Sequence, residues 1–260
     1  NTNTSISWLY DGTAPTLSSV SIASNNSTTT LAKADDVVTL TLTASEAIAT
    51  PVVTFQSGSA AITDTSVTYT NTSGNTWTAA YTANASDTSG AVSYSIAFND
   101  TAGNAGTAVT SGSGSVTFDG TAPTMTITAA EVSDGDTSND GTLSLTFTAS
   151  EATTDFAVAD ISVINGELSN FATTSSTVYT ATFTPSSDGA TTIDVASSTF
   201  TDAAGNNNIA ATQFNWTYDS VVPTMTITAA EVSDGDTSND ATLSMTFTAS
   251  EATSNFVVGD

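Results

Sequence analysis

The feature that most constrains the fold is a set of short motifs that returns at intervals of about 100 residues. Three motifs keep the same order along the chain: DGTAPT or DSVVPT at 11–16, 119–124 and 219–224, TASEA at 43–47, 148–152 and 248–252, and D-x-A-G-N at 100–104 and 202–206. Because a unit of this length is the size of one small domain, the sequence predicts a row of similar modules.

The copies also indicate where each module begins. Residues 123–160 and 223–260 differ at only six positions, which indicates a recent tandem duplication. The segment ISWLY before Asp11 matches FNWTY before Asp219, so the opening residues resemble the end of a module. The repeat frame predicts four parts: the last strand of a preceding module at 1–10, complete modules at 11–118 and 119–218, and a partial module at 219–260.

Within each module the apolar residues alternate with polar ones. Leu143, Leu145 and Phe147 are separated by Ser144 and Thr146, and similar short runs recur between clusters of Gly, Asn, Asp and Ser. This pattern predicts strands with one buried face and one solvated face, about seven in each module of about 100 residues. The expected fold is therefore all-β: tandem immunoglobulin-like Greek-key β-sandwiches arranged end to end.

The residue types that are missing exclude several functions. The chain has no Cys and no His, and Lys33 is its only basic residue against 26 Asp and Glu, for a net charge of −25. Disulfides, ordinary zinc sites and catalytic relays through His or Cys are excluded. Nucleic acid and anionic lipid are not expected partners, since both require basic surfaces. No apolar run reaches the roughly 18 residues of a membrane span, so no membrane insertion is expected.

Catalysis is not expected either. Paired carboxylates can hydrolyse glycosidic bonds, but they need a cleft, and a narrow sandwich with polar strand faces offers little concavity. Trp8, Trp77 and Trp216 fall in alternating strands, which favours packing in the sandwich over a platform for stacking sugars. The sequence predicts that the protein is not an enzyme.

The second module resembles the bacterial Ig-like repeats of large cell-surface adhesins. The resemblance rests on four segments of this module: FTASEAT at 147–153, F-x-x-x-D-I-x-V at 156–163, YTATFTP at 179–185 and TFTDAAGN at 199–206. The first module is similar to a related subtype that departs between residues 50 and 75. The resemblance implies an extracellular location on the cell surface, and many such repeats depend on calcium.

The alternating direction of successive strands predicts at which end of a module each acidic motif lies. In the second module, Asp119, Glu151 and Asp202 are expected at one pole with Asn206, and the loop with Asp134 and Asp136 at the other. Carboxylate and amide oxygens without basic partners suit Ca²⁺, so we expect this ion at the module junctions. The alternative is that these residues only form turns. The full candidate set is Asp11, Glu46, Asp100, Asn104, Asp119, Glu151, Asp202, Asn206, Asp219, Glu251, Asp134 and Asp136.

These expectations combine into a structural function. The sequence predicts a Ca²⁺-stiffened stalk that projects a distal domain from the cell, with neighbouring modules of the same chain as its main partners. Two alternatives stay open: a module that binds glycans or cells through its loops, and a surface-layer or sheath protein whose sister filaments pack laterally. Near identity of successive copies favours the stalk, because a dedicated binding site usually occurs once in such an array.

Overall fold

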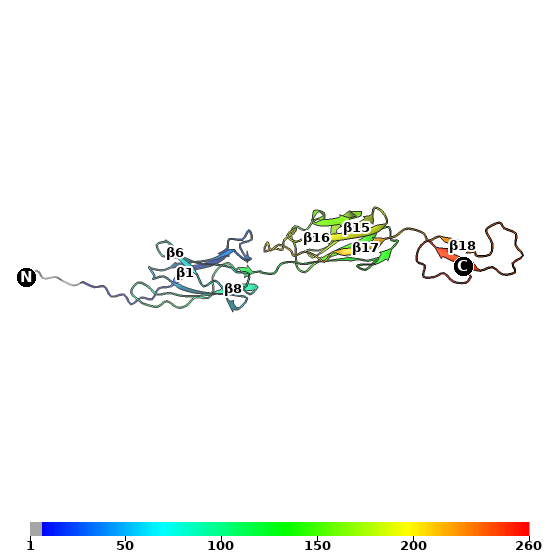
Figure 1. Cartoon of the computed structure of the whole chain (residues 1–260). Helices are drawn as coiled ribbons and strands as arrows, with labels where there is room; N and C mark the ends of the chain where they lie inside the picture. Colours follow the sequence, from blue (N-terminus) through cyan, green and yellow to red (C-terminus); the bar gives the residue numbers. More distant parts are fainter. Residues whose placement is uncertain (1–6, 260) are drawn as a thin grey trace, which may run out of the picture.

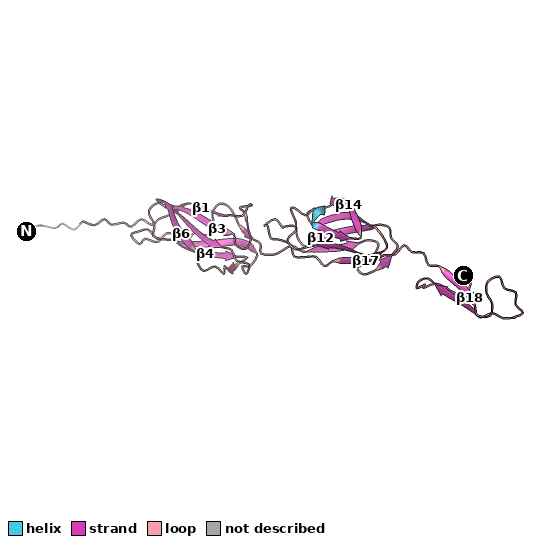
Figure 2. Ribbon diagram, turned by 45° about the horizontal axis from the view of Figure 1, so that its top comes forward, coloured by secondary structure: helices cyan, strands magenta, loops and turns pink. Residues whose placement is uncertain are grey.

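The computed structural model describes residues 7–259. Two sandwiches and a pair of strands follow one another along an extended chain, joined by short linkers (Figures 1 and 2). Within residues 7–259 the only helical element is the three-residue 3₁₀ helix η1, and no helix there is long and apolar enough to cross a membrane.

The first sandwich contains nine strands in two sheets. They are β1 (Leu17–Ser24), β2 (Leu31–Ala32), β3 (Val37–Ala44), β4 (Val52–Ser57), β5 (Ala60–Ala61), β6 (Thr68–Ser73), β7 (Thr76–Thr82), β8 (Gly90–Ala97) and β9 (Thr117–Phe118). One sheet has the order β1-β3-β7-β6 and the other β2-β9-β8-β4-β5.

The second sandwich repeats this plan with eight strands. They are β10 (Met125–Ala129), β11 (Thr137–Ser138), β12 (Leu143–Ala149), β13 (Ile161–Ile164), β14 (Gly166–Thr173), β15 (Val178–Pro185), β16 (Gly189–Val195) and β17 (Phe214–Tyr218), with η1 at Val158–Asp160. Its sheets have the orders β10-β12-β15-β14 and β11-β17-β16-β13.

The strand connections are those of an immunoglobulin-like sandwich. In each module the first strand pairs antiparallel with the second long strand. Between these two strands in the sequence, a two-residue strand, β2 or β11, belongs to the other sheet. It runs parallel to the last strand of the module, β9 or β17. The predicted all-β, immunoglobulin-like fold is confirmed.

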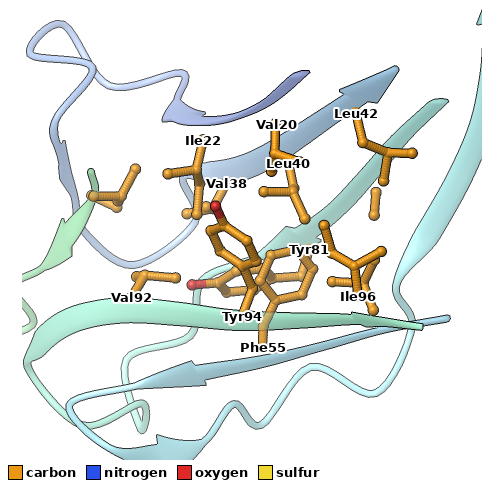
Figure 3. Packing of buried hydrophobic residues seen from close by; sticks show 14 of the residues in the cluster. Val20, Ile22, Val38, Leu40, Leu42, Phe55, Tyr81, Val92, Tyr94 and Ile96 are labelled. Carbon is orange, nitrogen blue, oxygen red and sulfur yellow. The ribbon is translucent and has the colours of Figure 1, made fainter. Parts of the chain in front are cut away.

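Each sandwich has its own core, built from the alternating apolar positions. Strand β3 buries Val38, Leu40, Leu42 and Ala44. The first three face residues of the opposite sheet such as Phe55 (Figure 3). Fully burying one such aliphatic side chain stabilises the fold by roughly 1.5–3 kcal/mol. One cluster of buried residues runs from Val20 to Phe118 and the other from Met125 to Trp216. The threonines between the apolar positions form the polar outer faces.

The last part of the described chain is an antiparallel pair, β18 (Met225–Ala229) and β19 (Met245–Ala249). Its register matches that of β10 and β12, yet Ile227 is 55% exposed where Ile127 is 7% exposed. The difference arises because two strands alone cannot enclose an apolar face.

The strand predicted at residues 1–10 falls partly on residues 1–6, which lie outside the described range. Residues 7–10 form no strand, and Trp8 is 76% exposed. The other two tryptophans pack in the sandwiches: Trp216 is 2% exposed, and Trp77 packs against the first core. The module boundaries themselves stay predictions.

Candidate cation sites at the module poles

Two groups of three carboxylates lie at corresponding places in the two sandwiches. One contains Asp11, Glu46 and Asp100, and the other contains Asp119, Glu151 and Asp202. In each group, which we call a triad, one carboxylate oxygen from every residue lies within 4.8 Å of the others. The structure thus brings together residues that are 32 to 89 positions apart in the sequence, as the count of strand directions predicts.

The first member of each triad comes from the linker. The backbone N–H of Thr121 donates to Oδ1 of Asp119 at 3.0 Å, and that of Thr13 donates to Oδ1 of Asp11 at the same distance. These bonds form the Asx turn that a D-G-T sequence favours. The turn uses Oδ1 of each aspartate, and Oδ2 accepts no hydrogen bond within residues 7–259.

The second member is a glutamate positioned by the serine before it. Thr124 donates its backbone N–H to Oγ of Ser150 at 3.0 Å, and the backbone N–H of Ser150 donates to the Thr124 carbonyl at 3.0 Å. This reciprocal pair fastens the end of β12 to the start of β10, so Glu151 follows directly at the pole. The same pair forms between Thr16 and Ser45 in the first module.

The third member lies in the D-x-A-G-N loop. In residues 202–206, the backbone N–H of Asn206 donates to Oδ1 of Asp202 at 2.9 Å, and the Asn206 side-chain amide donates to Oδ2 at 2.8 Å. Gly205 has a φ of +86°, a conformation that favours glycine. Asp202 is only 3% exposed. The loop therefore holds a nearly buried carboxylate in a fixed orientation, and loop 100–104 does the same with Asp100 and Asn104.

The two asparagines also hold the linkers. The Asn206 amide donates to the Asp119 carbonyl at 2.9 Å, and the Asn104 amide donates to the Asp11 carbonyl at 3.1 Å. The backbone N–H of Asp119 in turn donates to the Ala32 carbonyl of the first sandwich at 2.8 Å. Asp119 is thus bonded to both sandwiches, which ties the linker between them.

Each triad consists only of acidic residues, so no basic side chain within it balances the charges. Burial raises the pKa of Glu151 above its ordinary value of 4.5, and the negative charges of Asp119 and Asp202 raise it further. In the other triad, the hydrogen bond from the Asn104 side chain holds the pKa of Asp100 below its ordinary value. Ionised Glu151 is therefore costly unless a cation neutralises the site.

The geometry of the triads fits a calcium ion. Calcium binds oxygen ligands at about 2.3–2.6 Å, so two oxygens on one ion lie at most about 5 Å apart. The triad oxygens satisfy this limit. Asn104 and Asn206 use their amide nitrogens to hold neighbouring groups, so only their Oδ1 atoms are available as ligands. Their main contribution is to position the aspartates.

The remaining candidate residues are not brought into a triad of described residues. Asp219 accepts the backbone N–H of Val221 at 3.1 Å in the same Asx turn, and no D-x-A-G-N loop follows it in residues 219–260. Glu251 has one buried carboxylate oxygen, Oε1, without a hydrogen-bond partner in the described part of the chain.

Asp134 and Asp136 also lie outside both triads. Asp134 accepts the backbone N–H of Asn215 at 2.6 Å, and Asp136 accepts that of Ser133 at 2.8 Å. Asp136 therefore stabilises its own loop, which is the turn role that the sequence left open, whereas Asp134 fastens the loop to β17.

Sequence reasoning missed three features of the poles. The serine of TASEA pairs with the threonine of the APT or VPT segment, and this signal was visible because the two motifs repeat in phase. The asparagine of D-x-A-G-N holds the linker rather than acting first as a ligand. Direct contact between the sandwiches through Asn26 had no signal in the repeat pattern.

A family model described as a bacterial Ig-like domain matches residues 119–218. The resemblance drawn from the motifs of the second module is therefore confirmed for this segment. A search of curated proteins finds no match to the chain.

Solved structures with similar folds include InvD of Yersinia pseudotuberculosis, with a TM-score of 0.37 and 20% identity, covering 82% of this chain and 63% of that one. The chain thus spans less than two thirds of the InvD chain. The IG1+IG2 pair of DIP-gamma has a TM-score of 0.37 and 8% identity, with coverages of 78% and 96%. Titin domains z1z2 in complex with telethonin have a TM-score of 0.27 and 10% identity, with coverages of 81% of this chain and 98% of that one. At these scores the likenesses carry no argument about function.

Proposed function

We propose that this chain is a spacer segment of a bacterial surface adhesin or filament, a non-catalytic stalk that holds a distal domain away from the cell. The observation that carries the proposal is the repeated pole: in both sandwiches the linker, the turn after β3 or β12 and the D-x-A-G-N loop are fastened together. A chain that only presented binding loops would not need the same linker clamp in successive modules.

The proposal includes calcium as the ion that stiffens the stalk. Each triad gathers an oxygen from the linker aspartate and two from its sandwich, so one ion bound there would cross-link the linker to the module. The ion would also neutralise carboxylates that otherwise repel one another. The cost of bending the linker would then include the cost of breaking metal–oxygen bonds.

The surface of the sandwiches supports single stalks over laterally packed filaments. Strand β14 is an edge of its sheet, and its register shifts between Ser169 and Ala172, where Asn170 has a φ of +54°. A bulge of this kind disrupts the row of free backbone groups on an edge strand and discourages pairing with another chain. The net charge of −25 adds repulsion between neighbouring copies.

Small-angle scattering of the 260-residue chain across a concentration series tests the proposal, together with a glycan array. The stalk predicts a monomeric, elongated particle at all concentrations and no glycan above background. Lateral growth into sheets with rising concentration would support the surface-layer alternative and contradict the stalk. Specific retention of one glycan class would instead make the chain a binding module.

A further inference from the structure

The two sandwiches contact each other directly, in addition to their connection through the linker. The side-chain amide of Asn26, in the loop between β1 and β2, donates to the carbonyl of Ala204 in the second module at 2.9 Å. Directly after β2, the Lys33 side chain lies over Gly205. Its Cε is 3.5 Å from the position that a Cβ on that glycine would occupy. The only basic residue of the chain therefore lies on the loop at 202–206.

The burial of Ala204 shows that this contact covers the loop. Ala204 is 3% exposed, yet it is not part of the core cluster of the second sandwich. Its counterpart Ala102 is exposed in the matching loop at 100–104, where no sandwich precedes it in the described chain. Because the two loops have the same motif and the same internal hydrogen bonds, the neighbouring sandwich accounts for the difference.

Hydrogen bonds within the first module fix the orientation of the Asn26 side chain. It is only 8% exposed, its amide also donates to Oδ2 of Asp36 at 2.7 Å, and its Oδ1 accepts the backbone N–H of Thr28 at 3.0 Å. Little side-chain freedom is left to lose when the sandwiches meet, so the bond costs little entropy to form.

The corresponding loop of the second module has the opposite chemistry. Between β10 and β11 it carries Glu131, Asp134 and Asp136 and no asparagine, while the residue that follows β11, as Lys33 follows β2, is Asn139. The loop itself offers side-chain carboxylates, which accept hydrogen bonds, where the first module has the Asn26 amide. The β10–β11 loop therefore has no residue equivalent to Asn26.

We propose that Asn26 and Lys33 form a docking surface that recognises the D-x-A-G-N loop of the following module and fixes the angle between the two sandwiches without a bound cation. This goes beyond the stalk function, since it makes one junction rigid on its own while others depend on the linker. The partner that this surface fits is a loop with an outward carbonyl and a small residue, which Ala204 and Gly205 provide.

Distance measurements between spin labels test the docking in the full chain. The chain has no cysteine, so Ser93→Cys and Ser162→Cys place one label on an exposed position of each sandwich. In a chelator, the parent is expected to give a narrow distance distribution. Ala204→Trp is expected to broaden it, since the larger side chain has no space, whereas Ala102→Trp, at the exposed counterpart, is expected to leave it unchanged.

A second pair of variants replaces the amide donor with a carboxylate. Asn26→Asp keeps the acceptor for Thr28 but cannot donate to Ala204 or to Asp36, and it is expected to broaden the distribution. Asn25→Asp adds the same charge one residue earlier and keeps the acceptor for the backbone N–H of Val37, so it is expected to have no effect. Distributions that stay narrow in both Ala204→Trp and Asn26→Asp would overturn the proposal.

Trypsin supplies an independent readout because it can cut only after Lys33. Undocking is expected to speed this cleavage by at least about threefold in Ala204→Trp, and Ala102→Trp should match the parent. Equal rates in all three proteins would contradict the docking. Both readouts are taken in chelator, so a failure of calcium binding would leave them intact, and a failure of docking would leave the stalk proposal standing.

Discussion

Glu151 shows how a single residue connects the fold to the proposed ion. Its carboxylate sits beside Asp119 and Asp202, and burial together with these charges raises its pKa. A raised pKa means that the folded chain holds a proton more tightly than the unfolded chain does. In the absence of metal, ionised Glu151 therefore reduces stability at neutral pH.

Replacing Glu151 with Gln is expected to stabilise the calcium-free protein at pH 7, by less than about 1 kcal/mol because solvent screens the site. The extra stability of the variant over the parent is present above the raised pKa of Glu151. It shrinks as the pH falls through this pKa and disappears below the ordinary value of 4.5. Urea denaturation in chelator at several pH values measures this difference. Glu167→Gln, on exposed β14, is the control and should shift stability by at most about 0.5 kcal/mol. A destabilised Glu151→Gln at pH 7 would contradict the electrostatic account.

At the residue scale, the sequence predicts the triads but not how they are held. Strand direction alone places Asp119, Glu151 and Asp202 at one pole, because an antiparallel sandwich returns to the same end every second strand. The roles of Asp134 and Asp136 were open, since an aspartate that binds a backbone N–H and one that binds an ion have the same sequence signature. The structure shows that both accept backbone N–H groups and that neither belongs to a triad of described residues.

At the scale of elements, alternation of apolar and polar residues predicts the long strands well. The run with Leu143, Leu145 and Phe147 becomes β12, with the expected face buried, and β3 shows the same alternation. The two-residue strands β2 and β11 had no such signal, because their pairing depends on the last strand of the module, about 80 residues away. Short strands of this kind are fixed by tertiary contacts rather than by local pattern.

Gly166 illustrates how an element depends on close packing between strands. A Cβ at this position would lie 2.2 Å from the Phe183 ring and 2.7 Å from the Thr184 carbonyl oxygen, so β14 could not stay as close to β15. Gly166→Ala is expected to destabilise the second module by about 1–3 kcal/mol through overpacking. Gly141→Ala meets no atom within 4 Å and serves as the control. Chemical denaturation of both variants measures the effect, and equal stabilities would show that the strands adjust freely.

At the scale of the whole molecule, the separate cores imply separate stabilities. Phe183 is fully buried in the second core and contacts Trp216 edge-on at 6.1 Å between ring centroids. Phe183→Ala is expected to cost the second module about 3–5 kcal/mol and to leave the first module's melting transition nearly unchanged. Scanning calorimetry resolves the two transitions. Phe256→Ala, 46% exposed, is the control, and a single transition that shifts as a unit in Phe183→Ala would contradict independent modules.

The modular arrangement itself was predictable because the motifs recur in the same order at a spacing of about 100 residues, the length of one small domain. The contact between Asn26 and Ala204 was not, since it joins residues of different modules that have no counterpart pair elsewhere in the chain. Repeats in a sequence therefore predict what the modules have in common, including the linker poles, whereas the direct contact between the sandwiches depends on residues in which the copies differ.

Calorimetric titration of the chain with Ca²⁺ at neutral pH tests the central claim most directly. The account predicts two binding sites, one for each triad, with Glu46→Gln and Glu151→Gln each removing one and the double variant removing both. It also predicts that calcium raises the melting temperature of the parent but not of the double variant. Absence of heat up to millimolar Ca²⁺, or binding that persists unchanged in the double variant, would contradict it.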